Sequence, residues 1–223
     1  MIDFDALNKV RAEVTATGRE ILLVAATKTQ TKETVDEFMA LAPDFVLGEN
    51  RVQELVAKYD PRYRWHLIGQ LQTNKVKYII DKAELIHSLD RISLADEIEK
   101  QAQKHNKVQS CLVEINMGGE VSKGGVSPDE VVDFIISLKD YKHIKIEGIM
   151  SVLPNISTKD LDALYDELDL IFDVVKKIKQ DNVEIKYLSA GMSGDYTVAL
   201  RHKSNVLRLG RLIFGERVYT PSV

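Results

Sequence analysis

The segment ILLVAATKTQTKETVDEFMALAPDFVLGEN (residues 21–50) holds two short apolar runs separated by a stretch with helical spacing. The runs, residues 21–28 and 44–49, have the length and β-branched content of buried strands. Two strands joined by a helix run parallel, because the helical crossover returns the chain to the same edge of the sheet. The segment therefore predicts an α/β protein whose first strand ends at Lys28.

The same alternation continues to the C-terminus. The clearest helix spans residues 160–180, where Leu161, Leu164 and Leu168 recur at threes and fours, and a short helical connection is expected at 195–203. The eight predicted strands are 21–28, 44–49, 64–69, 85–89, 109–117, 144–152, 184–190 and 205–214. Eight alternating strands and helices, without a linker between them, predict an α/β fold with a single (β/α)8 TIM barrel domain over residues 1–223. An extra helix is expected over residues 3–17.

Composition limits the class of protein. The 223 residues are 44% hydrophobic and 29% charged, as in ordinary globular proteins. A net charge of −4 argues against nucleic acid as a partner, because such surfaces are usually basic. Cys111 is the only cysteine and cannot form an internal disulfide, which favours a reducing compartment. With no signal peptide and no run of eighteen apolar residues, we expect a cytoplasmic protein that does not span a membrane.

Polar residues gather where the predicted strands end. In a barrel of this type the active site lies at the C-terminal ends of the strands. The residues at or near those ends are Lys28, Glu49, Asn50, His66, Gly69, Gln70, Ser88, Asn116, Ser151, Ser189 and Arg208. Their concentration predicts a functional site at this face of the barrel.

Two glycine-containing loops predict a phosphate site. AGMSGD (190–195) and LGR (209–211) follow strands seven and eight, where such barrels commonly bind phosphate. Glycines let backbone N–H groups approach an anion, and Ser193 and Arg211 add donors. The alternative is that these glycines only close tight turns. A third glycine cluster, residues 116–128, lacks the order of a P-loop and is interpreted as a mobile loop.

Lys28 has two interpretations. It is either a solvated side chain that ends a strand, or an amine whose pKa burial and the neighbouring Arg208 would lower, which would allow it to attack a carbonyl. With the phosphate loops, the second interpretation predicts a phosphorylated carbonyl compound held as a Schiff base. Both pyridoxal phosphate and sugar-phosphate aldehydes fit. Asn50 could orient a ring or hydroxyl, and His66 is either a core histidine or a ligand.

The remaining histidines give no metal signal. His87, His105, His143 and His202 are scattered without the spacing of metal ligands, so no metal is expected.

Six motifs together resemble the YggS/PROSC family of pyridoxal-phosphate-binding proteins. The motifs are VAATKT (24–29), LGENRVQE (47–54), WHLIGQLQTNK (65–75), IHSLDR (86–91), LSAGMSGDY (188–196) and LRLGRLIFGER (207–217). The resemblance covers essentially the whole chain. It implies a barrel like the N-terminal domain of alanine racemases, with pyridoxal 5′-phosphate at its mouth.

The resemblance also implies roles for individual residues. Lys28 would hold the cofactor as a Schiff base, Asn50 and His66 would lie near its ring, and Arg208 would face the pyridine nitrogen. The remaining cofactor-binding residues, mainly around the phosphate, would be Ser189, Met192, Ser193, Gly210 and Arg211. Many relatives have a smaller residue at position 211, so the Arg211 backbone N–H is the expected donor. Ala190 stands where the family usually has methionine.

The family is linked to vitamin B6 and amino/keto-acid homeostasis and is described as monomeric, without robust catalysis. The sequence offers no counterpart of the β-rich domain that supplies a catalytic tyrosine in alanine racemases, and one lysine gives only one-sided proton transfer. Pyridoxal-phosphate homeostasis, with apo enzymes as recipients of the cofactor, is therefore the expected function. A weak racemase or transaminase-like enzyme remains the alternative, and a sugar-phosphate aldolase fits the lysine but not the motifs.

Overall fold

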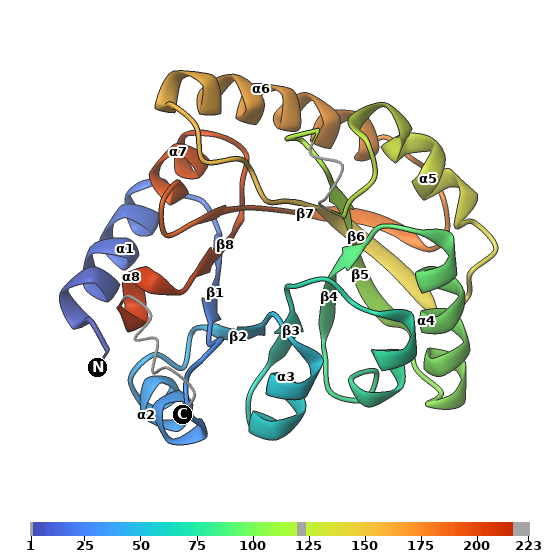
Figure 1. The fold of residues 1–223 in the computed structure, drawn as a ribbon. Coiled ribbons are helices and arrows are strands. Elements are labelled where there is room, and N and C mark those ends of the chain that lie inside the picture. The colour runs from blue at the N-terminus through green and yellow to red at the C-terminus, as the bar shows by residue number, and fades with distance from the viewer. Residues whose placement is uncertain (1, 120–123, 216–223) are drawn as a thin grey trace, which may run out of the picture.

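The computed structural model describes residues 2–119 and 124–215, and shows a closed barrel of eight parallel strands (Figure 1). Each strand pairs with the next one in the chain, and β8 pairs with β1 to close the ring. The strands are β1 (Leu22–Ala26), β2 (Val46–Glu49), β3 (Trp65–Leu67), β4 (Leu85–Leu89), β5 (Gln109–Ile115), β6 (Ile144–Ser151), β7 (Val183–Met192) and β8 (Val206–Leu209). The predicted fold class is confirmed, with all eight strands in the predicted order.

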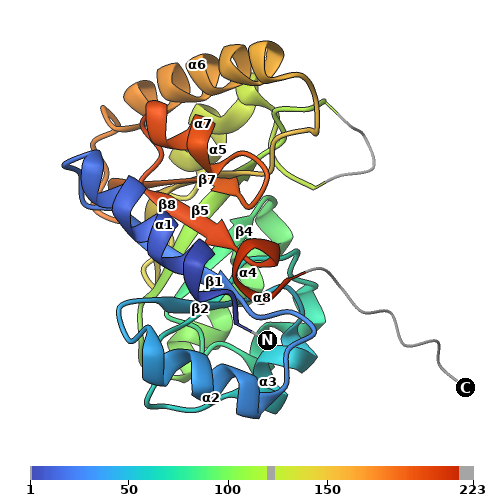
Figure 2. The ribbon, with the colours of Figure 1, turned by 90° about the vertical axis from the view of Figure 1, so that its left-hand side faces the viewer.

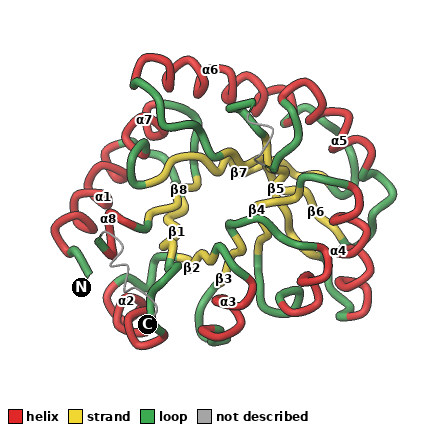
Figure 3. The backbone as a smooth tube through the Cα atoms, in the orientation of Figure 1, coloured by secondary structure: helices red, strands yellow, loops and turns green. Residues whose placement is uncertain are grey.

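Helices surround the strands on the outside (Figure 3). They are α1 (Phe4–Ala16), α2 (Lys32–Leu41), α3 (Val52–Lys58), α4 (Ile92–Lys104), α5 (Val131–Ser137), α6 (Thr158–Val175), α7 (Tyr196–Arg201) and α8 (Arg211–Phe214), with 3-10 turns η1 (Thr73–Tyr78) and η2 (Pro128–Glu130). The connection between β3 and β4 is η1, so a 3-10 turn stands there in place of an α-helical crossover. None of the helices in the described ranges is both long and apolar enough to cross a bilayer.

Alternating side chains divide the core into two parts. Leu23, Ala25 and Leu47 belong to the large cluster that packs the strands against the helices. Val24 and Val46, their neighbours along the strands, belong to a cluster inside the barrel that contains only residues from strands and strand ends. This period of two means that every second residue of a strand faces the barrel interior.

The last predicted strand is shorter in the structure than expected from the sequence. Residues 205–214 were expected to form one strand, but β8 ends at Leu209 and residues 211–214 form α8. The chain turns at Gly210, and Ile213 and Phe214 are buried against the outer core, where the Phe214 ring meets Phe38 edge-on at 5.3 Å. Adjacent apolar residues such as Ile213 and Phe214 occur both in strands and on the buried side of a helical turn, so the sequence pattern alone did not distinguish a strand from a helix here. The last two residues of the 207–217 motif and residues 120–123 of the glycine cluster lie outside the described ranges.

The predicted extra helix is α1, which lies on the outside of the barrel near β1 and β8 (Figure 2). Asp3 begins it, and its carboxylate accepts a hydrogen bond from the Ala6 N–H at 2.9 Å. The Asp3 N–H donates to the carbonyl of Ile213 at 2.8 Å, which joins α1 to α8. Both predicted ends of this helix, residues 3 and 17, lie one position outside the observed bounds.

Gly148→Ala should destabilise the barrel strongly. A Cβ at position 148 would lie 1.9 Å from the carbonyl oxygen of Tyr187, inside the β6–β7 pairing. We expect the free energy of unfolding to fall by about 3 kcal/mol or more, because backbone atoms of the sheet must separate. Urea unfolding measures the change. Gly194→Ala is the matched control, since a Cβ there meets no described atom within 4 Å; an equal loss in both variants would contradict the argument.

Candidate functional site

A cavity of about 820 Å³ opens at the C-terminal ends of the strands. Its volume is in the range of small-molecule and cofactor sites. Seven of the nine predicted site residues line it: Lys28, Asn50, Met192, Ser193, Arg208, Gly210 and Arg211. Segments far apart in the sequence therefore meet at one site.

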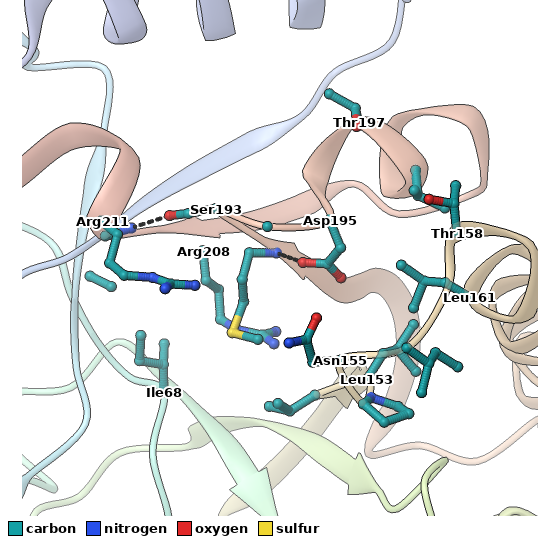
Figure 4. Close-up of a pocket in the computed structure, with 18 of the residues that line it drawn as sticks. Ile68, Leu153, Asn155, Thr158, Leu161, Ser193, Asp195, Thr197, Arg208 and Arg211 are labelled. Atoms are coloured by element: carbon teal, nitrogen blue, oxygen red, sulfur yellow. Dashed lines mark hydrogen bonds between the residues drawn. The ribbon is translucent and has the colours of Figure 1, made fainter. Parts of the chain in front are cut away.

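The loops after β7 and β8 meet on one side of the cavity. The Ser193 hydroxyl oxygen accepts hydrogen bonds from the backbone N–H groups of Gly210 (3.3 Å) and Leu212 (3.1 Å), so the loops after β7 and β8 are joined (Figure 4). A Cβ on Gly210 would lie 3.2 Å from the Ala26 carbonyl, so a side chain there would crowd β1. Arg211, the first residue of α8, lies between these two donors and lines the cavity. The Ser193 hydroxyl and the Arg211 N–H are the groups of the predicted phosphate cradle.

Asp195 holds the Ser193 loop in place. Its carboxylate accepts hydrogen bonds from the Met192 N–H (2.7 Å) and from the Tyr165 hydroxyl (2.7 Å). Burial, with the Asp195 charge next in importance, raises the pKa of Tyr165, so this hydroxyl remains a proton donor to the carboxylate. Each carboxylate oxygen of Asp195 therefore already accepts a hydrogen bond.

Arg208 places a buried cation in the cavity, and only 4% of the residue is exposed. Its guanidinium donates to the carbonyl of Ser189 (2.8 Å), to the Ser189 hydroxyl (2.6 Å) and to the carbonyl of Ser151 (2.9 Å). In Figure 4 the side chain lies near the centre of the cavity. Burial lowers the pKa of Arg208, but an arginine keeps its charge at any ordinary pH. The site thus has a fixed positive charge.

Asn50 follows β2 and lines the same cavity. Its amide oxygen is buried and has no hydrogen-bond partner among the described residues. A Cβ on Gly69 would lie 2.3 Å from the Asn50 carbonyl, so the glycine after β3 lets the two loops meet. A buried amide without a partner is costly, and a ligand with a polar group would satisfy it.

Lys28 is half-buried in the tight turn that follows β1. The Gln30 N–H donates to the carbonyl of Thr27 at 3.0 Å and closes the turn, with Lys28 and Thr29 at its two central positions. This turn places the lysine on the lining of the cavity that also contains the phosphate cradle and Arg208.

His66 and Ser189, the other two predicted site residues, lie inside the barrel. His66 Nδ1 is 3.0 Å from His87 Nε2, and His87 Nδ1 is 3.1 Å from the Ser189 hydroxyl, which also contacts Arg208. Burial lowers the pKa of His66 to about 3 and that of His87 well below its usual value, so both imidazoles are neutral. His66 is therefore connected to the cavity at the strand ends through the side chains of His87, Ser189 and Arg208, and it lines a separate cavity with Arg64 and Glu84.

His87 links His66 to Ser189 by hydrogen bonds, a role that the sequence analysis did not assign to it. It had been grouped with scattered histidines, although His66 and His87 both lie in the middle of adjacent strands. The alternation of side chains along β3 and β4 could have indicated this contact, because it places both His66 and His87 on the interior face of the barrel. In the described part of the chain, no three His, Cys, Asp or Glu side chains come together as a metal site.

Glu114 is a half-buried acid near Arg208 and gives a prediction about pH. Burial, with the charge of Asp90 next, raises its pKa from 4.5 to about 7, and one of its oxygens has no partner within the described residues. Between pH 4.5 and 7 the folded protein binds the proton that the unfolded chain releases. The free energy of unfolding should therefore fall as the pH rises through this window, by on the order of 3 kcal/mol, and then level off.

Glu114→Gln should remove this contribution and be more stable than the wild type above pH 7. Thermal or urea unfolding from pH 4 to 9 compares the two proteins. Parallel pH profiles would show that Glu114 does not titrate in this way.

Comparison with known proteins agrees with the fold. The sequence profile described as "Alanine racemase, N-terminal domain" matches residues 6–218. An alanine racemase from Clostridium difficile superposes with a TM-score of 0.76 at 16% identity, over 99% of this chain and 58% of that one, which shows a shared fold. The chain is thus an α/β barrel of the alanine racemase N-terminal class.

Closer relatives identify the family. The pyridoxal phosphate homeostasis protein of Aquifex aeolicus is 42% identical over 202 residues, which cover 88% of this chain and 87% of that protein. PipY from Synechococcus elongatus, in a structure with pyridoxal phosphate bound, superposes with a TM-score of 0.82 at 25% identity, over 95% of this chain and 99% of that one. The chain belongs to the pyridoxal phosphate homeostasis protein family.

Proposed function

We propose that this protein binds pyridoxal 5′-phosphate through a Schiff base to Lys28 and acts in cellular homeostasis of that cofactor. The observation that carries the proposal is the single cavity in which Lys28, the Ser193 cradle and the Arg208 cation meet. The unpaired buried oxygen of Asn50 also fits, because the cofactor has polar ring substituents. Membership of the family, and the ligand in the PipY structure, support the same ligand.

Each residue has a role that follows from its position. The Ser193 hydroxyl and the backbone N–H of Arg211 would donate to the phosphate dianion, while the Gly210 and Leu212 N–H groups hold the serine oxygen in place. Met192 would pack beside the ring, and Asn50 would orient a ring substituent. Lys28, as the neutral amine, would form a C=N bond with the aldehyde carbon, and the aldehyde oxygen would leave as water.

Arg208 limits the chemistry of the site. When bound, pyridoxal phosphate serves as an electron sink, most effectively with a protonated ring nitrogen. Arg208 only donates hydrogen bonds and carries a permanent charge, so a nitrogen facing it would remain unprotonated. His66, His87 and Ser189 would hold the arginine from behind without adding charge, because both histidines are neutral.

The cavity is poorly equipped for proton transfer. Apart from Lys28, the only acid or base on its described lining is Asp195, since arginine remains charged; both Asp195 oxygens already accept hydrogen bonds from Met192 and Tyr165. Racemisation by two bases needs a second proton carrier opposite the lysine. The lining therefore favours holding and delivering the cofactor over turnover of amino acids.

A transfer assay tests this function. The loaded protein, freed of excess cofactor, is mixed with an apo pyridoxal-phosphate enzyme, and the activity gained by that enzyme is followed with time. We expect delivery from the loaded protein and no racemisation or transamination by the protein alone. Amino-acid turnover by the purified protein that is lost in Lys28→Ala would favour the enzyme alternative instead.

A further inference from the structure

The turn that carries Lys28 has a strained backbone. Thr29 has a φ of +68°, whereas the φ of Lys28 is not positive, so the turn has the sign pattern of type II. Position three of such a turn normally holds glycine, and a β-branched residue at positive φ is a clear outlier. Backbone strain of this kind persists only where the surroundings enforce it.

Lys58, at the end of α3, holds both ends of this turn. Its ammonium donates to the carbonyl of Thr27 at 2.8 Å and to that of Gln30 at 3.3 Å. The side chain is 7% exposed, although lysine is among the residues least often buried. Its charge is balanced by an ion pair with Glu49 and by Glu54 at 3.7 Å.

The two glutamates hold the rest of the turn. Glu49, fully buried, accepts a hydrogen bond from the Thr27 hydroxyl at 2.6 Å. Glu54 accepts one from the N–H of the strained Thr29 at 3.0 Å. All three residues that flank Lys28 in the turn are therefore bound to Glu49, Glu54 or Lys58.

Glu49 also connects the turn to the end of β2, the strand next to β1. It immediately precedes Asn50, whose side chain lines the cofactor cavity. The buried Lys58–Glu49 pair thus links the turn around Lys28, after β1, to the backbone next to Asn50, after β2. A buried ion pair adds little net stability compared with a neutral pair of the same shape, so stability alone does not account for it.

We propose that Lys58, paired with Glu49, is a positioning residue that fixes the direction of the Lys28 amine and so sets the rate of covalent cofactor attachment. The inference rests on the function proposed above. Without the pair, Thr29 would relax to negative φ and the Lys28 side chain would leave its attacking position. The phosphate cradle lies in the loops after β7 and β8, and the Ser193 hydrogen bonds that join these loops do not involve Lys58 or Glu49, so it should be unaffected.

The experiment uses the double variant Glu49→Gln/Lys58→Met, which removes one charge of each sign and leaves the local net charge unchanged. Apo protein is mixed with pyridoxal 5′-phosphate, and the rate at which the visible band appears is measured by stopped flow. We expect the rate to fall about tenfold or more, the order of effect that backbone strain of this size can produce. Glu54→Ala, at a more exposed position, should slow attachment less.

Pyridoxine 5′-phosphate provides the matched control, because it has an alcohol where the cofactor has its aldehyde and cannot form a Schiff base. Its affinity should be the same for the wild type and the double variant. Equal losses for both ligands, or an unchanged attachment rate in the double variant, would overturn the positioning role. If the double variant does not fold, a wild-type rate in Glu54→Ala overturns it. A wild type that never forms the band would instead refute the proposed function itself.

Discussion

Lys28→Ala is expected to abolish the visible absorbance of the protein after incubation with pyridoxal 5′-phosphate. The band requires conjugation of the ring with a C=N bond, and alanine supplies no nitrogen for it. Retention of the cofactor through dialysis should fall by about a hundredfold, close to 3 kcal/mol, because only the non-covalent contacts remain. Absorbance spectra before and after dialysis measure both effects.

Lys77→Ala is the matched control, since Lys77 is exposed on η1 and is absent from the lining of the cavity. It should keep the wild-type spectrum and retention. A Lys28→Ala protein that remained yellow after dialysis would show that another amine holds the cofactor.

Ser193→Asp should strongly weaken binding of the cofactor at the phosphate cradle. The new carboxylate could accept the hydrogen bonds that Gly210 and Leu212 now donate to the serine, so the fold should be retained. A negative charge about 4 Å from the phosphate costs on the order of 4 kcal/mol at a protein surface, or about a thousandfold in affinity. Equilibrium titration with the cofactor, beside an unfolding curve, separates binding from stability.

Ser193→Ala tests the same cradle without adding charge. It removes one hydroxyl and leaves the backbone donors in place, so affinity should fall only about tenfold. Equal affinities for Ser193→Asp and the wild type would mean that the phosphate does not bind at this loop.

The fold could be predicted because its signals are local. Each strand is a short apolar run and each helix has its own spacing, so eight repeats were countable without knowledge of any long-range contact. The short helix α7 and the N-terminal helix α1 appeared where expected for this reason. The exception, α8, has only four residues, too few for a helical period to be visible.

The site could be predicted only in part. Lys28, Asn50, Ser193 and Arg208 stand at strand ends, and topology alone brings strand ends together. The chain from His66 through His87 to Ser189 depends on which residues of three strands face inward at the same height. That height is set by the register between strands, which no single segment encodes.

The contacts behind Lys28 were not predictable in this way. Lys58 looks like an ordinary charge in the last turn of a helix, and Glu49 like a strand end. Their burial follows from the packing of α3 against the barrel. The positive φ of Thr29 likewise has no sequence signal, because threonine is a residue that would not be expected there.

The most direct test of the central claim is to find the site of covalent attachment. The protein loaded with pyridoxal 5′-phosphate is reduced with borohydride, digested and analysed by peptide mass spectrometry. We predict a phosphopyridoxyl group on Lys28 at near-stoichiometric occupancy, with only traces on exposed lysines. An unmodified Lys28, with the cofactor lost or bound to a different lysine, would contradict the account.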